Sequence, residues 1–315
     1  MRLSYQSRIT ASALLMLLVL FLIMSALWFP RTDRTIKVMD LLFVLDITQS
    51  MDVVDVEKDS DTISRLTWAK DYTRQTLQTL PCGSHVGLAV FSESRSLILM
   101  NPVEVCDSYH DLTQMIDKIN GPMAWALSSE ISKAAFTAID QAKLMKPKPS
   151  VVFITDGHES PPLHKTLYPK YKGSAGQVSG VFVGVGGDKL VPIPKHDLDG
   201  NDVGFWQENE VLHQDVYAAS RGDVSEELGG GVSRTEHLSS LKQSHIKQLA
   251  TMLDFEYVIS PSKPTSLINT LEQNSEHRDQ NVSYDWSLWF AAIALFILVL
   301  LYSPYNRSRD GSVSD

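Results

Sequence analysis

The sequence contains only two cysteines, and it lacks any excess of positive charge. Lys and Arg number 28 against 37 Asp and Glu, which gives a formal net charge of −9 at pH 7. Proteins that bind nucleic acids carry basic patches, often with interleaved aromatic residues, because the phosphate backbone is negatively charged. No such patch occurs in these 315 residues. A nucleic acid is therefore not expected as a partner.

Signatures of common hydrolases are also missing from the sequence. No Gly-x-Ser-x-Gly elbow occurs, so the serine nucleophile of an α/β-hydrolase has no candidate. The nine histidines show no His-Glu-x-x-His spacing, which would place two zinc ligands on one helix. An aspartyl phosphotransferase would need a second carboxylate two residues after Asp46, where Thr48 stands. We therefore expect that the protein is not an enzyme.

Charge is absent from two long stretches near the ends of the chain. Residues 9–29 and 286–302 contain no charged side chain, and a bilayer core needs about 17–25 apolar residues per helix. We predict membrane-spanning helices over residues 9–29 and 286–303. A cleaved signal peptide is the alternative for the first stretch, but its apolar run is longer than a signal core and residues 25–27 make a weak cleavage site. An uncleaved anchor is favoured.

Two spans place both chain ends on one side of a membrane. Residues 1–8 and 304–315 are then expected to be cytoplasmic, and residues 31–285 lie on the other side. Arginines flank the first span on both sides, so the count of positive charges leaves the orientation nearly undecided.

The two cysteines bear on that orientation. Cys82 precedes an expected strand at residues 85–91, and Cys106 follows another at residues 96–103. The cysteines are symmetric about residue 94, in the expected hairpin turn, so an antiparallel register sets the two thiols opposite one another. Two small buried thiols are the alternative. Because disulfides persist in oxidising compartments, the pattern favours a periplasmic domain.

Buried strands alternate with amphipathic helices between the two spans. Apolar runs indicate strands at residues 41–45, 150–157, 178–185 and 256–259, and helical periodicity indicates helices at residues 62–80, 131–142, 239–253 and 264–271. This alternation is typical of an open, mostly parallel, doubly wound α/β sheet. The cysteine hairpin adds an antiparallel edge to that sheet.

Oxygen-bearing side chains follow two of these strands. Asp46, Thr48 and Ser50 come directly after the strand at residues 41–45, and Asp156 ends the apolar run of the second strand. Because the carboxyl ends of parallel strands meet at one edge of a sheet, we expect these side chains to lie together. Carboxylates and hydroxyls suit a hard cation such as Mg²⁺ or Ca²⁺. The alternative is that the first three residues only cap the following helix.

These motifs resemble the von Willebrand factor A domain family and its metal-ion-dependent adhesion site. The family has Asp-x-Ser-x-Ser after the first strand, a threonine in a middle loop, and an aspartate after the fourth strand. Asp-Ile-Thr-Gln-Ser at residues 46–50 matches the first motif, with a threonine in place of one serine, and Thr-Asp-Gly at residues 155–157 matches the last. The resemblance implies a domain over residues 37–275.

Two serines are candidates for the position of the family's middle-loop threonine. Ser129 stands where the family has its threonine, because an apolar residue follows at the second position after it and a small residue at the fifth. Ser128 is the competing position.

The resemblance implies a binding function without chemical turnover. A Mg²⁺ ion, or alternatively Mn²⁺ or Ca²⁺, would be held by Thr48, Ser50 and Ser129, with Asp46 and Asp156 nearby or bound through water. In the family, an open coordination position takes a carboxylate from a partner protein.

A metal-dependent hydrolase is the alternative function. It would use the same two aspartates, with His158 or Glu159 as the base for a metal-bound water. The simpler interpretation of His158 and Glu159 is a pair in a loop or at a helix start that faces solvent.

A narrower resemblance is to membrane-anchored bacterial members of the family, which occur with a MoxR-type AAA+ ATPase. Residues 45–51, 80–84, 103–106 and 123–126 are similar to methanol dehydrogenase maturation proteins of the MxaL and MxaC kind, and residues 191–194 to the Bat aerotolerance proteins. The resemblance implies help in the assembly or metal loading of a periplasmic enzyme of the methanol dehydrogenase type. The ATPase and other membrane-bound von Willebrand A proteins are the implied partners.

Two stretches interrupt the alternation of strands and helices. Asp197, Asp199 and Asn201 have the spacing of a calcium-binding EF-hand loop, but Asp202 occupies the position that needs glycine. A hairpin turn at residues 199–200 explains this stretch more simply. Residues 207–236 are expected to form a mobile surface insertion.

Overall fold

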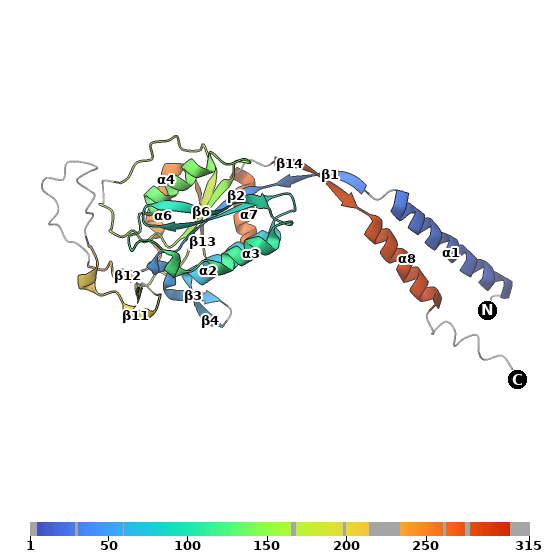
Figure 1. The fold of residues 1–315 in the computed structure, drawn as a ribbon, viewed down its shortest axis with the longest axis horizontal. Coiled ribbons are helices and arrows are strands. Elements are labelled where there is room, and N and C mark those ends of the chain that lie inside the picture. Colours follow the sequence, from blue (N-terminus) through green and yellow to red (C-terminus); the bar gives the residue numbers. More distant parts are fainter. Residues whose placement is uncertain are drawn as a thin grey trace. The chain divides into compact units, whose positions relative to one another are not determined.

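The computed structural model describes residues 5–28, 31–58, 60–164, 168–197, 200–213, 234–260, 263–274 and 278–302. The chain divides into two compact units (Figure 1). One unit is Lys37–Arg278, and the other combines Met1–Ile36 with Asp279–Asp315. The sequence analysis places its domain at residues 37–275, within the larger unit.

A six-stranded mixed sheet, in the order β13-β8-β7-β2-β5-β6, forms the centre of the larger unit. The strands are β2 (Asp40–Asp46), β5 (His85–Ser92), β6 (Arg95–Glu104), β7 (Ser150–Thr155), β8 (Gly180–Gly184) and β13 (Glu256–Ile259). Five of these strands are parallel, and β6 pairs antiparallel with β5 at one edge. The predicted α/β fold class and the antiparallel edge hairpin are both confirmed.

The central strand β2 contributes to a hydrophobic core on each face of the sheet. Leu41, Phe43 and Leu45 belong to one core, and Leu42 and Val44 belong to the other. Alternate side chains of a strand point to opposite faces, so a strand covered on both sides needs an unbroken apolar run. All seven residues of β2 are buried, as this apolar run predicts.

Helices cover both faces of the sheet (Figure 1). One core includes α2 (Arg65–Thr79), α3 (Tyr109–Lys118) and α7 (Pro264–Asn274), and the other includes α4 (Ile131–Ala142) and α6 (Gln243–Leu253). The bounds of α4 agree with the prediction, because its stripe of small apolar residues faces the sheet. Helix α3 was not predicted from the sequence.

The helix predicted over residues 62–80 begins three residues later, at Arg65. The Ser64 hydroxyl accepts a hydrogen bond from the Thr67 N–H at 3.1 Å and caps the helix. The residues before it form β4 (Asp61–Ser64), which pairs antiparallel with β3 (Val54–Lys58). This hairpin was not predicted, and it makes Arg65 the first residue of α2.

Short elements lie in the chain between β8 and β13. They are β9 (Val191–Pro192), β10 (Pro194–His196), β11 (Asp202–Phe205), the one-turn helix η3 (Glu208–Glu210) and β12 (Leu238–Ser239). The strands β10 and β11 pair antiparallel on either side of Gly200, as expected of a hairpin turn. Asp199 of the calcium-loop alternative lies outside the described residues, as does most of the predicted insertion at residues 207–236.

The described residues of the smaller unit form two helices and most of two strands. Helix α1 (Tyr5–Trp28) packs against α8 (Ser287–Tyr302), and β1 (Arg31–Val38) pairs with β14 (Arg278–Asp285). Among the helices of the described ranges, none has both the length and the apolar character needed to cross a membrane. The predicted spans over residues 9–29 and 286–303 stay predictions, and parts of the predicted tails, residues 1–4 and 303–315, lie outside the description.

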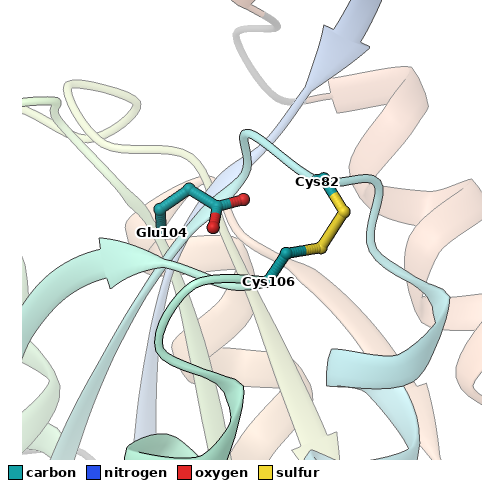
Figure 2. Close-up of side chains that lie close together, drawn as sticks. All are labelled: Cys82, Glu104 and Cys106. Atoms are coloured by element: carbon teal, nitrogen blue, oxygen red, sulfur yellow. A yellow bond between two sulfur atoms is a disulfide. The ribbon is translucent and has the colours of Figure 1, made fainter. Parts of the chain in front are cut away.

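Cys82 and Cys106 form a disulfide at the base of the β5–β6 hairpin (Figure 2), with their Cα atoms 5.3 Å apart. His85 of β5 lies opposite Glu104 of β6, just inside the bridge. The Glu104 carboxylate accepts hydrogen bonds from the backbone N–H groups of Gly83 and Asp107, so it joins the two segments that carry the cysteines. The symmetry of the cysteines about the turn therefore agrees with the structure.

Reduction of this disulfide is expected to destabilise the protein. The bridge spans 24 residues of sequence, which corresponds to about 3 kcal/mol in the chain-entropy model and to a fall in Tm of roughly 6–12 °C for a domain of this size. Thermal unfolding of the wild type with and without dithiothreitol measures this. The Cys82→Ser/Cys106→Ser double variant is the control and should not respond to the reductant. Full alkylation of the unreduced wild type would contradict the expectation.

Candidate metal centre

The aspartates predicted to lie at a metal site are neighbours at the carboxyl ends of β2 and β7. Asp46 is the last residue of β2, and Asp156 directly follows the last residue of β7. These two strands pair in parallel, and both carboxylates are fully buried. The placement predicted from the two apolar strands is therefore present.

The Asp46 carboxylate accepts three hydrogen bonds. Its Oδ1 accepts from the backbone N–H of Thr48 at 2.9 Å and from the Thr48 hydroxyl at 2.7 Å, and its Oδ2 accepts from the Thr155 hydroxyl at 2.7 Å. Burial and the nearby Asp156 nevertheless raise the pKa of Asp46 to about 7. The site thus holds negative charge that these neutral donors compensate only in part.

Three residues with buried hydroxyls line one cavity at this end of the sheet. The Thr48 and Ser50 hydroxyls are 3.3 Å apart, at the start of the one-turn helix η1 (Gln49–Asp52). Together with Ser129 and His158 they line a cavity of about 260 Å³. Ser129 is only 2% exposed, and its Oγ has no hydrogen-bond partner in the described part of the chain. Because an unpaired buried hydroxyl is unfavourable, Ser129 Oγ is a candidate ligand atom.

The main chain fixes Ser129 from two sides. Its N–H donates to the Ser160 carbonyl at 2.7 Å, and the Ser160 N–H donates back at 2.8 Å. On the other side, the Glu93 N–H donates to the Ser128 carbonyl at 3.0 Å and the Glu130 N–H donates to the Glu93 carbonyl. Ser128 also lines the cavity but is only half-buried. The burial and the unpaired oxygen favour Ser129 over Ser128 as the middle ligand.

Taken together, the donor set fits a hard divalent cation. Thr48, Ser50 and Ser129 line one cavity, the hydroxyls of the first two are hydrogen-bonded to the buried carboxylates of Asp46 and Asp156, and the Ser129 hydroxyl is unpaired among the described residues. Oxygen ligands of this kind are those that Mg²⁺ prefers in proteins.

Arg65 belongs to this site, although the sequence analysis did not identify it. Its side chain is fully buried. Nε and Nη2 donate to the two carboxylate oxygens of Asp55 at 3.0 and 2.6 Å, and Nη1 donates to Asp156 Oδ2 at 2.5 Å. The sequence does contain an indication that Arg65 is buried. Arg65 precedes Ala69 by four residues and Tyr72 by seven, so it lies on the same, buried face of α2.

The environment of Asp156 differs from that of Asp46. Burial would raise the pKa of Asp156, but the Arg65 guanidinium beside it holds that pKa below its usual range. The His158 N–H donates to Asp156 Oδ1 at 2.9 Å, and the Ser50 hydroxyl is also hydrogen-bonded to this carboxylate. Asp156 is therefore ionised at neutral pH, whereas for Asp46 neutral pH is close to the pKa.

The expectation that His158 and Glu159 face solvent is wrong, since they are 3% and 7% exposed. The Glu159 carboxylate accepts from the Ile131 N–H and from the N–H and hydroxyl of Ser132, so it caps the first turn of α4, and it also contacts His245. Those bonds give Glu159 a structural role. His158 lines the cavity, and burial lowers its pKa to about 4, so its imidazole is neutral at pH 7.

Apolar side chains form the outer wall of the cavity. The segment between β9 and β12 contributes Ile193, Trp206, Val211 and Leu212, and Leu127 and Pro161 also line the cavity. The Trp206 indole N–H donates to the Gln49 side chain in η1, which fastens this segment to the loop that carries Thr48 and Ser50. Two carboxylates, Glu210 and Glu236, also line the cavity.

Residues 41–158 match the von Willebrand factor type A domain family. The chain carries a von Willebrand factor type A domain. The matched range includes all five residues that were predicted to surround the metal, namely Asp46, Thr48, Ser50, Ser129 and Asp156. No curated protein matches the chain.

Several solved structures are similar to this chain. An aerotolerance-related membrane protein from Bacteroides fragilis NCTC 9343 and BatB from Bacteroides thetaiotaomicron are each 16% identical, with a TM-score of 0.48, and each alignment covers 75% of this chain and 98% of the other. An uncharacterised membrane-spanning protein from Vibrio fischeri is 14% identical, with a TM-score of 0.29, over 77% of this chain and 99% of the other.

The stability of the metal-free protein is expected to depend on pH through Asp46. Its pKa in the folded protein is about 7, above the ordinary value of 3.8, so folding becomes less favourable as pH rises from about 4 through 7. Asp46→Asn removes this ionisation and keeps the shape of the side chain. In EDTA, the Tm of the variant minus the Tm of the wild type should increase as the pH is raised from 5 to 8. A difference in Tm that is constant over this range would contradict the raised pKa.

Proposed function

We propose that the von Willebrand A domain binds a divalent metal ion, Mg²⁺ in the first instance and Mn²⁺ or Ca²⁺ as alternatives. Thr48, Ser50 and Ser129 would hold the ion, with Asp46 and Asp156 adjacent or bound through water. The observation that carries this proposal is the buried Ser129 Oγ, which has no partner in the described chain and lines the same cavity as the other two hydroxyls. A bound ion would supply an electrophilic position for an oxygen ligand.

The ligand at that position is proposed to be a carboxylate of a partner protein. Few charged groups would contact the ion directly, because Thr48, Ser50 and Ser129 are neutral ligands, so the ion keeps its attraction for an anion. Leu127 and Leu212 at the cavity wall are 66% and 54% exposed. Apolar contacts beside a polar anchor are typical of protein–protein interfaces, which supports a protein ligand over a small polar substrate.

The smaller unit is proposed to hold the protein at a bacterial inner membrane as a two-pass anchor, with the domain in the periplasm. Large apolar side chains of α1 and α8 are more than half exposed, among them Leu14, Leu17, Phe21, Leu295 and Phe296. Exposed apolar patches of this kind mark surfaces that contact lipid or other proteins. The disulfide supports the periplasmic side, because it persists in an oxidising compartment.

In this setting the domain would assist the assembly or metal loading of a periplasmic enzyme, of the methanol dehydrogenase type. Further partners would be a MoxR-type AAA+ ATPase and other membrane-bound von Willebrand A proteins. This part of the proposal rests on the resemblance of the sequence to the membrane-anchored bacterial members of the family.

Two neighbouring serines provide a matched pair of variants for the metal site. In the full-length protein in detergent, Ser129→Ala should weaken Mg²⁺ binding about ten-fold or more, because it removes a ligand oxygen, whereas Ser128→Ala should leave the affinity within about two-fold. Isothermal titration calorimetry measures both affinities. Retention of a partner protein should follow the same order and should be lost in EDTA.

Other outcomes of these measurements would count against the proposal. Equal Mg²⁺ affinity in the wild type and both serine variants would remove the metal site. Reproducible turnover of an ester or phosphoester that disappears in His158→Ala would favour a metal-dependent hydrolase, with His158 as its base. Glu159→Gln serves as a structural control in that assay, because Glu159 caps α4.

Extraction of membranes at alkaline pH tests the anchor. Carbonate strips peripheral proteins from membranes but leaves spanning helices in the bilayer, so the full-length protein should stay in the membrane pellet. Release of the protein into the supernatant, together with a peripheral marker protein, would contradict the two-pass anchor.

A further inference from the structure

Arg65 joins four separate segments of the larger unit around the candidate metal centre. Its guanidinium donates to Asp55 in β3, to the Ser50 carbonyl in η1, to Asp156 after β7, and to the hydroxyl and carbonyl of Ser239 in β12. The side chain is fully buried. A buried arginine is tolerated when its donors are satisfied and its charge is paired, and here both conditions are met.

The main chain is shaped to receive this side chain. A Cβ added to Gly186 would lie 2.6 Å from Arg65 Nε, so only glycine allows this approach. The N–H of the next residue, Gly187, donates to Asp55 Oδ2 at 3.0 Å and thereby orients the carboxylate that holds the guanidinium. The position of Arg65 is thus fixed from more than one side.

Arg65 in turn limits the orientations available to Asp156. Asp156 Oδ2 accepts from Arg65 Nη1 at 2.5 Å and from the Ser239 hydroxyl at 3.0 Å, while Oδ1 accepts from the His158 N–H at 2.9 Å. Rotation of the carboxylate would break at least two of these bonds. Its orientation is therefore set before any ion arrives.

The balance of charge also points to a cation. Asp46, Asp55 and Asp156 carry three negative charges when ionised, and Arg65 carries one positive charge, which leaves two negative charges among these four side chains. A divalent ion would neutralise that remainder. A lysine could not replace Arg65, because its single ammonium group lacks the planar fork that reaches both carboxylates at once.

We propose that Arg65 is the positioning residue of this metal centre: held by Asp55, it fixes Asp156 in the orientation in which that carboxylate serves the ion. The inference rests on the metal binding proposed above. If Arg65 only stabilised the fold, its replacement would lower Tm but would leave the affinity of the folded protein for metal unchanged.

The test compares Mg²⁺ affinity among variants of the full-length protein in detergent, by isothermal titration calorimetry. Arg65→Lys keeps the charge but loses the fork, and its Kd for Mg²⁺ should rise about 10–100-fold, the usual effect of removing a group that orients a metal ligand. Asp55→Asn keeps Arg65 and removes its anchor, and its Kd should rise by a smaller factor. Near-UV circular dichroism verifies that each variant is folded.

Arg74→Lys is the matched control. Arg74 lies on the same helix and pairs with Asp71 and Asp117, neither of which is among the described residues that line the cavity. Its replacement should leave the Kd for Mg²⁺ unchanged.

The possible results distinguish a failure of the positioning role of Arg65 from a failure of the proposed metal binding. Unchanged Mg²⁺ affinity in folded Arg65→Lys overturns the positioning role and leaves the metal site intact. If Arg65→Lys does not fold, an unchanged affinity in Asp55→Asn overturns the role in the same way. A wild-type protein that binds no Mg²⁺ overturns both the inference and the proposed metal site.

Discussion

The rest of the site depends on the burial of two carboxylates side by side. Asp46 ends one strand and Asp156 follows the end of its parallel neighbour, so the sheet itself brings two buried carboxylates together. Such a pair is unfavourable unless hydrogen bonds, a counter-charge or protonation relieves it. Neutral hydroxyl and amide donors surround Asp46, whereas Asp156 has the guanidinium of Arg65. Asp55 from the β3–β4 hairpin and Ser239 from β12 accept the remaining hydrogen bonds of the Arg65 guanidinium.

The parts of the site that sequence could predict are those that local patterns encode. An unbroken apolar run marks a strand covered on both faces, and the residue after it lies at the edge of the sheet, so Asp46 and Asp156 were found from β2 and β7 alone. Ser129 was predicted from the resemblance to the von Willebrand A family, because Ile131 and Ala134 follow it at the family's spacing. In each case the information lies within about a dozen residues of chain.

The parts that sequence did not predict depend on pairings between distant residues. Arg65 and Ser239 are 174 residues apart, and no local period relates them. Charged residues such as Arg65 and Glu159 are usually solvated at a helix start or in a loop, so their burial does not follow from the sequence. Both are buried because a partner from elsewhere in the chain satisfies them, Asp55 and Asp156 for the arginine and the first turn of α4 for Glu159. Pairing between residues from different parts of the chain thus overrides the preference of a charged side chain for solvent.

The β5–β6 hairpin lies between the disulfide and the candidate metal centre, so the register of its two strands affects both. The disulfide closes one end of the two strands, and at the other end Glu93 exchanges backbone hydrogen bonds with Ser128 and Glu130 on either side of Ser129. A slip of one residue in the pairing would displace that end by about 3.4 Å and turn every side chain of the strand to the opposite face. The exposed disulfide thus fixes the register of the two strands, and through that register it fixes the position of the buried candidate ligand oxygen of Ser129.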